Sequence, residues 1–278
     1  MRKHVLGIDH VVILVHDLDH ARDAYARMGF TLTPRGYHTL GSQNHCIMFG
    51  NDYIELLAMT KTHPAMQYFT DFLARGEGLA GIALATDDAA GAHAALAQAG
   101  LPADAPMEFS RPVELPGGTR DAAFKVVQMP VDLTAGARMF FCQHYTRDVV
   151  WRPDCLSHAI GATGIAALAV VVDDPATAVR NYARIFDETP HAIDEGLLVN
   201  TGSAPIALST RGRIGKRLDG VALPLRPRPL VAALFIKVAD RARAAETLRN
   251  GGYSPVAMKD GSFAIGADEA HGVTLVFG

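Results

Sequence analysis

The chain has 278 residues, of which 49% are hydrophobic and 20% charged, so it can bury one large core or two of ordinary size. Its formal net charge of −3 argues against a nucleic-acid-binding or polybasic membrane surface. No apolar run approaches the ~18 residues of a membrane span, and no signal-peptide core precedes the first apolar segment. We therefore expect a soluble, cytoplasmic protein. Its cysteines lack metal-binding spacing and are expected to be free, mostly buried thiols: Cys46, Cys142 and Cys155.

The first apolar segment, from Gly7 to Asp17, predicts a buried strand with one histidine inside it. Because side chains alternate along a strand, two faces are expected, one with Ile8, His10, Val12 and Leu14, the other with Asp9, Val11, Ile13 and Val15. A histidine among aliphatic side chains needs a partner, which is a carbonyl, a carboxylate or a metal ion. A helix is predicted over residues 21–28, ended by Gly29.

Three more strands are predicted before residue 60, over residues 30–38, 45–49 and 53–59. The last of them carries Glu55, a carboxylate in an otherwise apolar run. The first unit is therefore a strand, a helix and three strands.

This order recurs three times, which indicates a duplicated supersecondary unit. Each repeat opens on an apolar strand followed by an acid and a short helix. The four units are expected over residues 5–59, 78–145, 164–210 and 230–278. Two units would form each domain, with domains over residues 1–155 and 156–278.

The architecture and two motifs resemble the vicinal oxygen chelate superfamily. The motifs are Gly-Ile-Asp-His-Val-Val at the first strand and Tyr-Ile-Glu-Leu at the fourth. That superfamily holds glyoxalase I, extradiol dioxygenases, methylmalonyl-CoA epimerase and bleomycin-resistance proteins. The string Phe140 to His144, leading to Val150 to Pro153, looks like its glyoxalase-like-domain group. The architectural resemblance covers nearly the whole chain, whereas the specific motifs lie in the first 160 residues.

The resemblance implies an α+β fold, in which four βαβββ units pair into two cupped, barrel-like mixed sheets. It also implies that the first and fourth strands supply ligands for a divalent metal ion. Carried over by position, His10 and Glu55 are the expected metal ligands and catalytic residues. Imidazole nitrogen and carboxylate oxygen suit Fe, Mn, Co, Ni or Zn. A metal-free binding cup remains the alternative.

The second unit departs from the family pattern. Aligning Gly78 with Gly7 places Gly81 opposite His10, so its first-strand ligand is missing. Near the end of its fourth strand lie Gln143 and His144, on opposite faces of a regular strand. The family pattern favours Gln143 as the third ligand, and imidazole chemistry favours His144.

Four further residues are candidates for substrate binding. Asn44 lies just before the predicted strand over residues 45–49, and His45 is its first residue, so both are expected at the mouth of the cup. His158 lies in the link between the two domains. Arg111 is a candidate partner for an anionic substrate, although an arginine beside a proline is more often a surface residue.

The expected function is a metal-dependent lyase, isomerase or dioxygenase acting on a small oxygenated molecule. The alternative is a metal-free protein that sequesters a small compound, as bleomycin-resistance proteins do. The second domain is expected to be a degenerate copy, because aliphatic residues replace the donors in its first and fourth strands. The expected partner is a small molecule, with no nucleic acid and no membrane, and a homodimer is possible.

Overall fold

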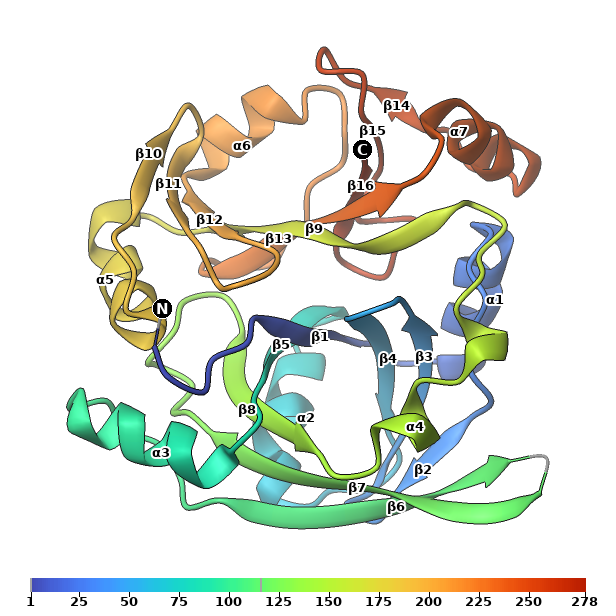
Figure 1. Ribbon diagram of the computed structural model, residues 1–278. Coiled ribbons are helices and arrows are strands. Elements are labelled where there is room, and N and C mark those ends of the chain that lie inside the picture. Colours follow the sequence, from blue (N-terminus) through green and yellow to red (C-terminus); the bar gives the residue numbers. More distant parts are fainter. Residues whose placement is uncertain (1, 116) are drawn as a thin grey trace.

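The computed structural model describes residues 2–115 and 117–278 (Figure 1). Its secondary structure confirms the fourfold order of strand, helix and three strands. The first unit contains β1 (Ile8–Leu14), α1 (Leu18–Arg27), β2 (Gly36–His38), β3 (Ser42–Met48) and β4 (Tyr53–Met59). The second contains β5 (Gly78–Ala85), α3 (Ala89–Gln98), β6 (Met107–Leu115), β7 (Gly118–Gln128) and β8 (Arg138–His144).

The later units follow the same order, and their last two strands are shorter than those of the first two units. The third contains β9 (Ala162–Val171), α5 (Pro175–Phe186), β10 (His191–Ile193), β11 (Gly196–Val199) and β12 (Ile206–Ser209). The fourth contains β13 (Leu230–Val238), α7 (Arg241–Asn250), β14 (Val256–Ala257), β15 (Phe263–Ile265) and β16 (Thr274–Phe277).

Each unit begins its helix in the same way. The aspartate that follows each first strand accepts a hydrogen bond from a backbone N–H of the first helical turn, which satisfies a group that the helix leaves unpaired. The four capping residues are Asp17, Asp88, Asp174 and Asp240. The acid that recurs in the sequence is therefore a helix cap.

The links between units hold helical segments that the sequence did not predict. They are η1 (Pro64–Met66), α2 (Gln67–Leu73), α4 (Arg147–Val150), η2 (Pro153–Cys155) and α6 (Arg211–Arg217). The predicted second strand was too long, because only Gly36–His38 of residues 30–38 pairs with β3.

The strands form two eight-stranded mixed sheets, ordered β2-β3-β4-β1-β5-β8-β7-β6 and β10-β11-β12-β9-β13-β16-β15-β14. In each sheet the first strands of two units pair antiparallel at the centre, and each also pairs in parallel with the last strand of its own unit. The first sheet curls until its edges meet, since a Cβ placed on Gly36 of β2 would lie 2.9 Å from the Arg111 guanidinium on β6. This confirms the predicted α+β fold of cupped mixed sheets.

The backs of the two sheets share one hydrophobic core. Val11 and Ile13 of β1 and Ile82 of β5 belong to the same buried cluster as Leu168 of β9 and Leu234 of β13. Helix α1 lies beside α7, and α3 lies beside α5 (Figure 1). The cups therefore open away from each other, one on each side of the molecule.

Strand β1 departs from the regular alternation that the sequence predicts. Its pairing with β5 shifts register between Ile8 and His10, which is the mark of a β-bulge. Ile8 consequently joins the core between the sheets with Val11, while Asp9 hydrogen-bonds His144 on the cup side. The predicted faces were wrong for Ile8 and Asp9 and correct for the residues after them.

The second cup is filled by the chain itself. Ile214 and Leu218 of α6 are buried against Ala232 and Ala233 of β13, with Leu223 packed beside them. The Arg- and Pro-rich link, which reads as polar in the sequence, thus supplies the apolar side chains that occupy this cup.

The structure also bears on two expectations drawn from the composition, which concern membrane-spanning segments and the cysteines. Within residues 2–115 and 117–278, no helix has the length and apolar character needed to cross a membrane. The three cysteines are free and buried, as predicted.

Candidate functional site

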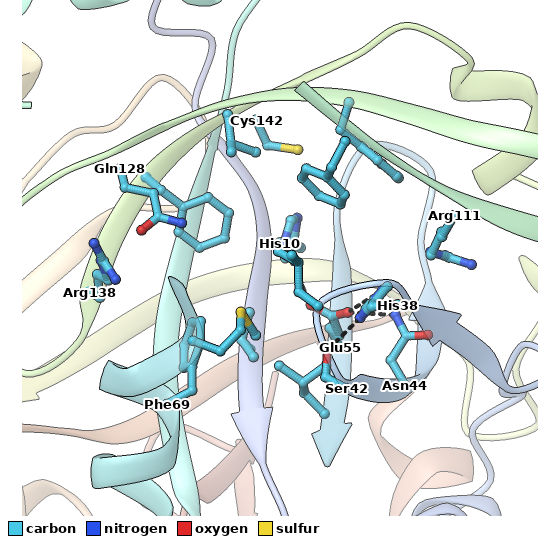
Figure 2. A pocket seen from close by; sticks show the side chains of 18 of the residues that line it. His10, His38, Ser42, Asn44, Glu55, Phe69, Arg111, Gln128, Arg138 and Cys142 are labelled. Atoms are coloured by element: carbon cyan, nitrogen blue, oxygen red, sulfur yellow. Dashed lines mark hydrogen bonds and ion pairs between the residues drawn. The ribbon is translucent and has the colours of Figure 1, made fainter. Parts of the chain in front are cut away.

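The first cup encloses a cavity of about 110 Å³ (Figure 2). Its wall is mostly aliphatic and aromatic, with Phe69 of α2 closing one side. The polar side chains that reach it include His10, His38, Asn44, Glu55, Arg111 and Arg138. An apolar cavity with a few polar groups is the usual form of a small-molecule site.

His10 presents one ring nitrogen to this cavity. Its Nδ1 lies 2.7 Å from Asp9 Oδ2, and its Nε2 lies 3.8 Å from Glu55 Oε2. Burial raises the pKa of Asp9, but hydrogen bonds from His10 and His144 outweigh burial and hold that pKa well below its usual range. An ionised carboxylate only accepts hydrogen bonds, so His10 donates from Nδ1, and Nε2 is the ring nitrogen that faces the cavity.

Glu55 projects from β4 into the same space. Asn44 of β3 donates a hydrogen bond from Nδ2 to Glu55 Oε1 at 2.5 Å, which fixes the carboxylate plane. The side chain of Glu55 is 11% exposed. Glu55 Oε2 faces His10 Nε2, but the two atoms are 3.8 Å apart, which is too far for a hydrogen bond. Both atoms therefore remain accessible from the cavity.

His38 is a site residue that the sequence reasoning missed. Its Nε2 lies 3.9 Å from Glu55 Oε1, and its Nδ1 lies 2.8 Å from Ser42 Oγ. Burial lowers the pKa of His38 to about 4, against the opposing effect of Glu55, so the imidazole is neutral at neutral pH. The sequence placed His38 at the end of a predicted strand, but only the structure shows that His38 pairs with Ser42 beside the cavity.

Gln143 and His144, the two candidates for a third ligand, lie on opposite faces of β8. His144 shares the cup side with Phe140 and Cys142, and its Nε2 lies 3.0 Å from Asp9 Oδ2. Gln143 turns away, donates to the Asp87 carbonyl and accepts from the Ala89 N–H at the start of α3. The prediction of Gln143 as a metal ligand was wrong, because its side chain caps a helix.

The register of the sheet also places the fourth-strand position of the second unit. His10 pairs with Tyr53, two residues before Glu55. Gly81 pairs with Arg138, two residues before Phe140. Phe140 is therefore the counterpart of Glu55, and the second unit supplies a glycine and a phenylalanine where the family pattern expects donors.

The four predicted substrate-binding residues divide evenly. Asn44 and Arg111 line the cavity. His45 lies on the other face of β3 with Nδ1 against the Thr33 carbonyl, so its predicted role was wrong. His158 was wrongly placed as well, because it accepts from the Thr31 N–H and donates to the Met48 carbonyl away from the cavity.

Two groups of side chains bear on metal binding. Asp9, Cys142 and His144 form a buried group whose donor atoms all lie within 4.8 Å of one another. Its Asp9 Oδ2 is already engaged by two imidazoles. Around Glu55, by contrast, His10 and His38 each direct Nε2 at the carboxylate without a hydrogen bond (Figure 2). A carboxylate behind a histidine is the usual support of a metal ligand, and Asp9 holds this position behind His10.

The paired units and the first cup define a protein of vicinal oxygen chelate fold, and solved structures agree. A hypothetical protein from Staphylococcus aureus is 15% identical with a TM-score of 0.69, over 98% of this chain and 98% of that chain. A xylose isomerase-like TIM barrel/4-hydroxyphenylpyruvate dioxygenase fusion protein is 14% identical with a TM-score of 0.63, over 100% of this chain and 49% of that chain.

A mutant of 4-hydroxymandelate synthase from Streptomyces coelicolor is 13% identical with a TM-score of 0.62, over 100% of this chain and 92% of that chain. Likeness at these identities shows the fold alone. The sequence profile of the glyoxalase-like domain family matches residues 8–186, so the chain belongs to that family. No protein with a curated description matches the sequence.

Proposed function

We propose that this protein binds one divalent metal ion in the first cup and acts as a lyase, isomerase or dioxygenase on a small oxygenated organic substrate. One observation carries the proposal. The Nε2 atom of His10 and the Oε2 atom of Glu55 face each other across 3.8 Å at an apolar cavity, with Asp9 behind the imidazole. Two such groups are costly to bury unless an ion or a substrate engages them.

His38 takes the place of the ligand that the second unit lacks. With His10 and Glu55 it makes two imidazoles and one carboxylate, a donor set that binds Fe, Mn, Co, Ni and Zn and leaves coordination positions open. A bound ion would supply positive charge that polarises the oxygen atoms of a substrate. The dioxygenase alternative also draws on one structural relative, the fusion protein that contains a 4-hydroxyphenylpyruvate dioxygenase, although its identity of 14% supports the fold only.

The surrounding residues have supporting roles in this proposal. Asp9 fixes the tautomer of His10, and Asn44 fixes the Glu55 carboxylate. The aromatic wall, including Phe69 and Phe109, excludes water from the reacting groups. The active half would be residues 1–155, and residues 156–278 would be a structural copy whose cup is filled.

The second candidate function is metal-free binding of a small molecule. It is favoured by Gly81 and Phe140, which stand at the two donor positions of the second unit. In that case Glu55 and His10 would hydrogen-bond the ligand directly.

Metal stoichiometry separates the two functions. We expect the protein, loaded with Mn²⁺, Co²⁺ or Zn²⁺ and then dialysed, to retain about one ion per chain. His10→Ala and Glu55→Ala should each abolish retention, because two donors hold an ion poorly. His191→Ala is the control, since His191 is exposed on β10 of the other sheet. Full retention by the double variant of His10 and Glu55 would refute the proposed site.

A further inference from the structure

Arg111 is a buried cation for which the described part of the chain supplies no partner. It lies on β6 and is 9% exposed, and its side chain lines the cavity of the first cup. Within the described residues, its guanidinium makes neither a hydrogen bond nor an ion pair. Arginine stays protonated in proteins, and a buried charge left unpaired is costly. Its burial therefore indicates that an anionic group joins it when the cavity is filled.

The other arginine of the cavity is already engaged. Arg138 donates to the Met129 carbonyl, lies 3.7 Å from an Asp104 carboxylate oxygen, and stacks over the Tyr68 ring. Figure 2 shows it on the side of the cavity opposite Arg111. Among the described residues that line the cavity, Arg111 is therefore the arginine left free to pair with a ligand anion, and it lies on the same side as His38 and Asn44.

The residues that precede Arg111 on β6 indicate that the rest of the ligand is apolar. Met107 and Phe109 precede it on the same face of β6, and Phe109 stacks on Phe124 of β7 with ring centroids 5.0 Å apart. These side chains form an apolar floor that ends at the guanidinium. The cavity of about 110 Å³ is smaller than the engineered cavity of ~150 Å³ that takes up benzene, so the body that fits is small.

We propose that the site takes a small carboxylic acid with an apolar body, whose carboxylate pairs with Arg111 while its body rests on Phe109 and Phe124. The guanidinium fork matches a carboxylate in two-point hydrogen bonding, which a neutral amide does not reproduce. This inference rests on the proposed function only in taking the first cup as the substrate site. Recognition through Arg111 does not require a metal ion.

The experiment uses matched acids and amides on the whole protein. The pairs are propionate and propionamide, butyrate and butyramide, and isobutyrate and isobutyramide, each titrated by calorimetry. The variants are Arg111→Met, Arg111→Lys and, as the control, Arg120→Met. Arg120 lies on the adjoining strand β7, is exposed, and pairs with Asp148, so its loss changes the net charge equally.

We expect at least one acid to bind the unaltered protein more tightly than its amide. Arg111→Met should weaken that acid about 10- to 100-fold and leave the amide unchanged. Arg120→Met should bind as the unaltered protein does. If Arg111→Met does not fold, Arg111→Lys still tests the idea, because an ammonium lacks the planar fork and should bind the acid less tightly. Equal binding of acids and amides, or failure of every acid to bind, overturns the inference.

Repeating the titrations with metal-stripped and metal-loaded protein separates this inference from the proposed function. If acids are preferred only when the metal ion is present, and the preference survives Arg111→Met, then the ion recognises the carboxylate. That result overturns the inference and leaves the proposed function intact. A preference that depends on Arg111 in protein that retains no metal would support the inference and remove the metal-dependent function.

Discussion

Phe140 occupies on β8 the position that Glu55 occupies on β4, as the pairing of each strand with its central neighbour shows. Its ring packs edge-on against His10, with centroids 5.6 Å apart. The opposite donor position is closed as well, because a Cβ on Gly81 would lie 3.1 Å from Val12. The cup thus keeps the donors of its first unit, while the second unit has a glycine and a phenylalanine at the two corresponding positions.

Phe140→Glu should restore a donor to the cup. A carboxylate at this position lies beside His10, so we expect divalent metal to bind at least about tenfold more tightly than in the unaltered protein. Calorimetry with Mn²⁺ or Co²⁺ measures this. Phe140→Gln is the matched control, because it has the same shape without the charge. Equal affinities for the two variants would place the ion elsewhere.

Asn44→Ala should weaken metal binding without abolishing it. The Asn44 amide holds Oε1 of Glu55, and loss of such support typically costs about 10- to 100-fold in metal affinity. Gln43→Ala is the control, since Gln43 is the adjacent residue and bonds Arg35 instead. An unchanged affinity in Asn44→Ala would show that Glu55 is not a ligand.

Cobalt spectroscopy should distinguish the two candidate groups of donors. The group around Glu55 has no sulfur, whereas Cys142 belongs to the buried group with Asp9 and His144. We expect Co²⁺-loaded protein to lack a thiolate-to-cobalt absorption band, and Cys142→Ser to leave its spectrum unchanged. A band that disappears in Cys142→Ser would move the ion to the buried group.

His158→Ala should destabilise the fold and spare the site. The ring satisfies two backbone groups, the Thr31 N–H and the Met48 carbonyl, and an unsatisfied buried group costs about 1–3 kcal/mol. We expect a lower melting temperature together with full metal retention. Loss of metal from a variant that remains folded would return His158 to the site.

The stability contributed by Asp52 should depend on pH. Burial raises the pKa of Asp52 to about 6, although its Oδ1 accepts a hydrogen bond from the Ile165 N–H. The pKa in the unfolded chain is near 3.8, so between pH 3.8 and about 6 the carboxyl is protonated in the folded state and ionised in the unfolded state. The stability of the fold therefore decreases as the pH rises through that range. Asp52→Asn keeps the acceptor and removes the charge.

We therefore expect Asp52→Asn to match the unaltered protein below pH ~4 and to exceed it by roughly 2–3 kcal/mol above pH ~6. Urea unfolding across this range provides the measurement. A constant difference between the two proteins at all pH values would contradict the assignment.

The sequence alone determined the repeated units, because each repeat carries its own local signals. An apolar run and an aspartate cap, followed in three of the four units by a glycine stop, specify strand and helix without help from distant residues. His10 and Glu55 were also identifiable, since a polar side chain inside an apolar strand is conspicuous. Segments without such signals were missed: helix α6 lies in a stretch rich in Arg and Pro, and its burial depends on an empty cup that only the folded sheet provides.

Tertiary structure decided which side chains meet. The bulge at Asp9 moved a carboxylate behind His10, and no residue-by-residue alternation predicts a bulge. Register selected Phe140 as the counterpart of Glu55, and closure of the sheet brought His38 and Arg111 to the cavity. These positions depend on hydrogen bonding between strands far apart in the chain, where a shift of one residue turns every side chain to the other face.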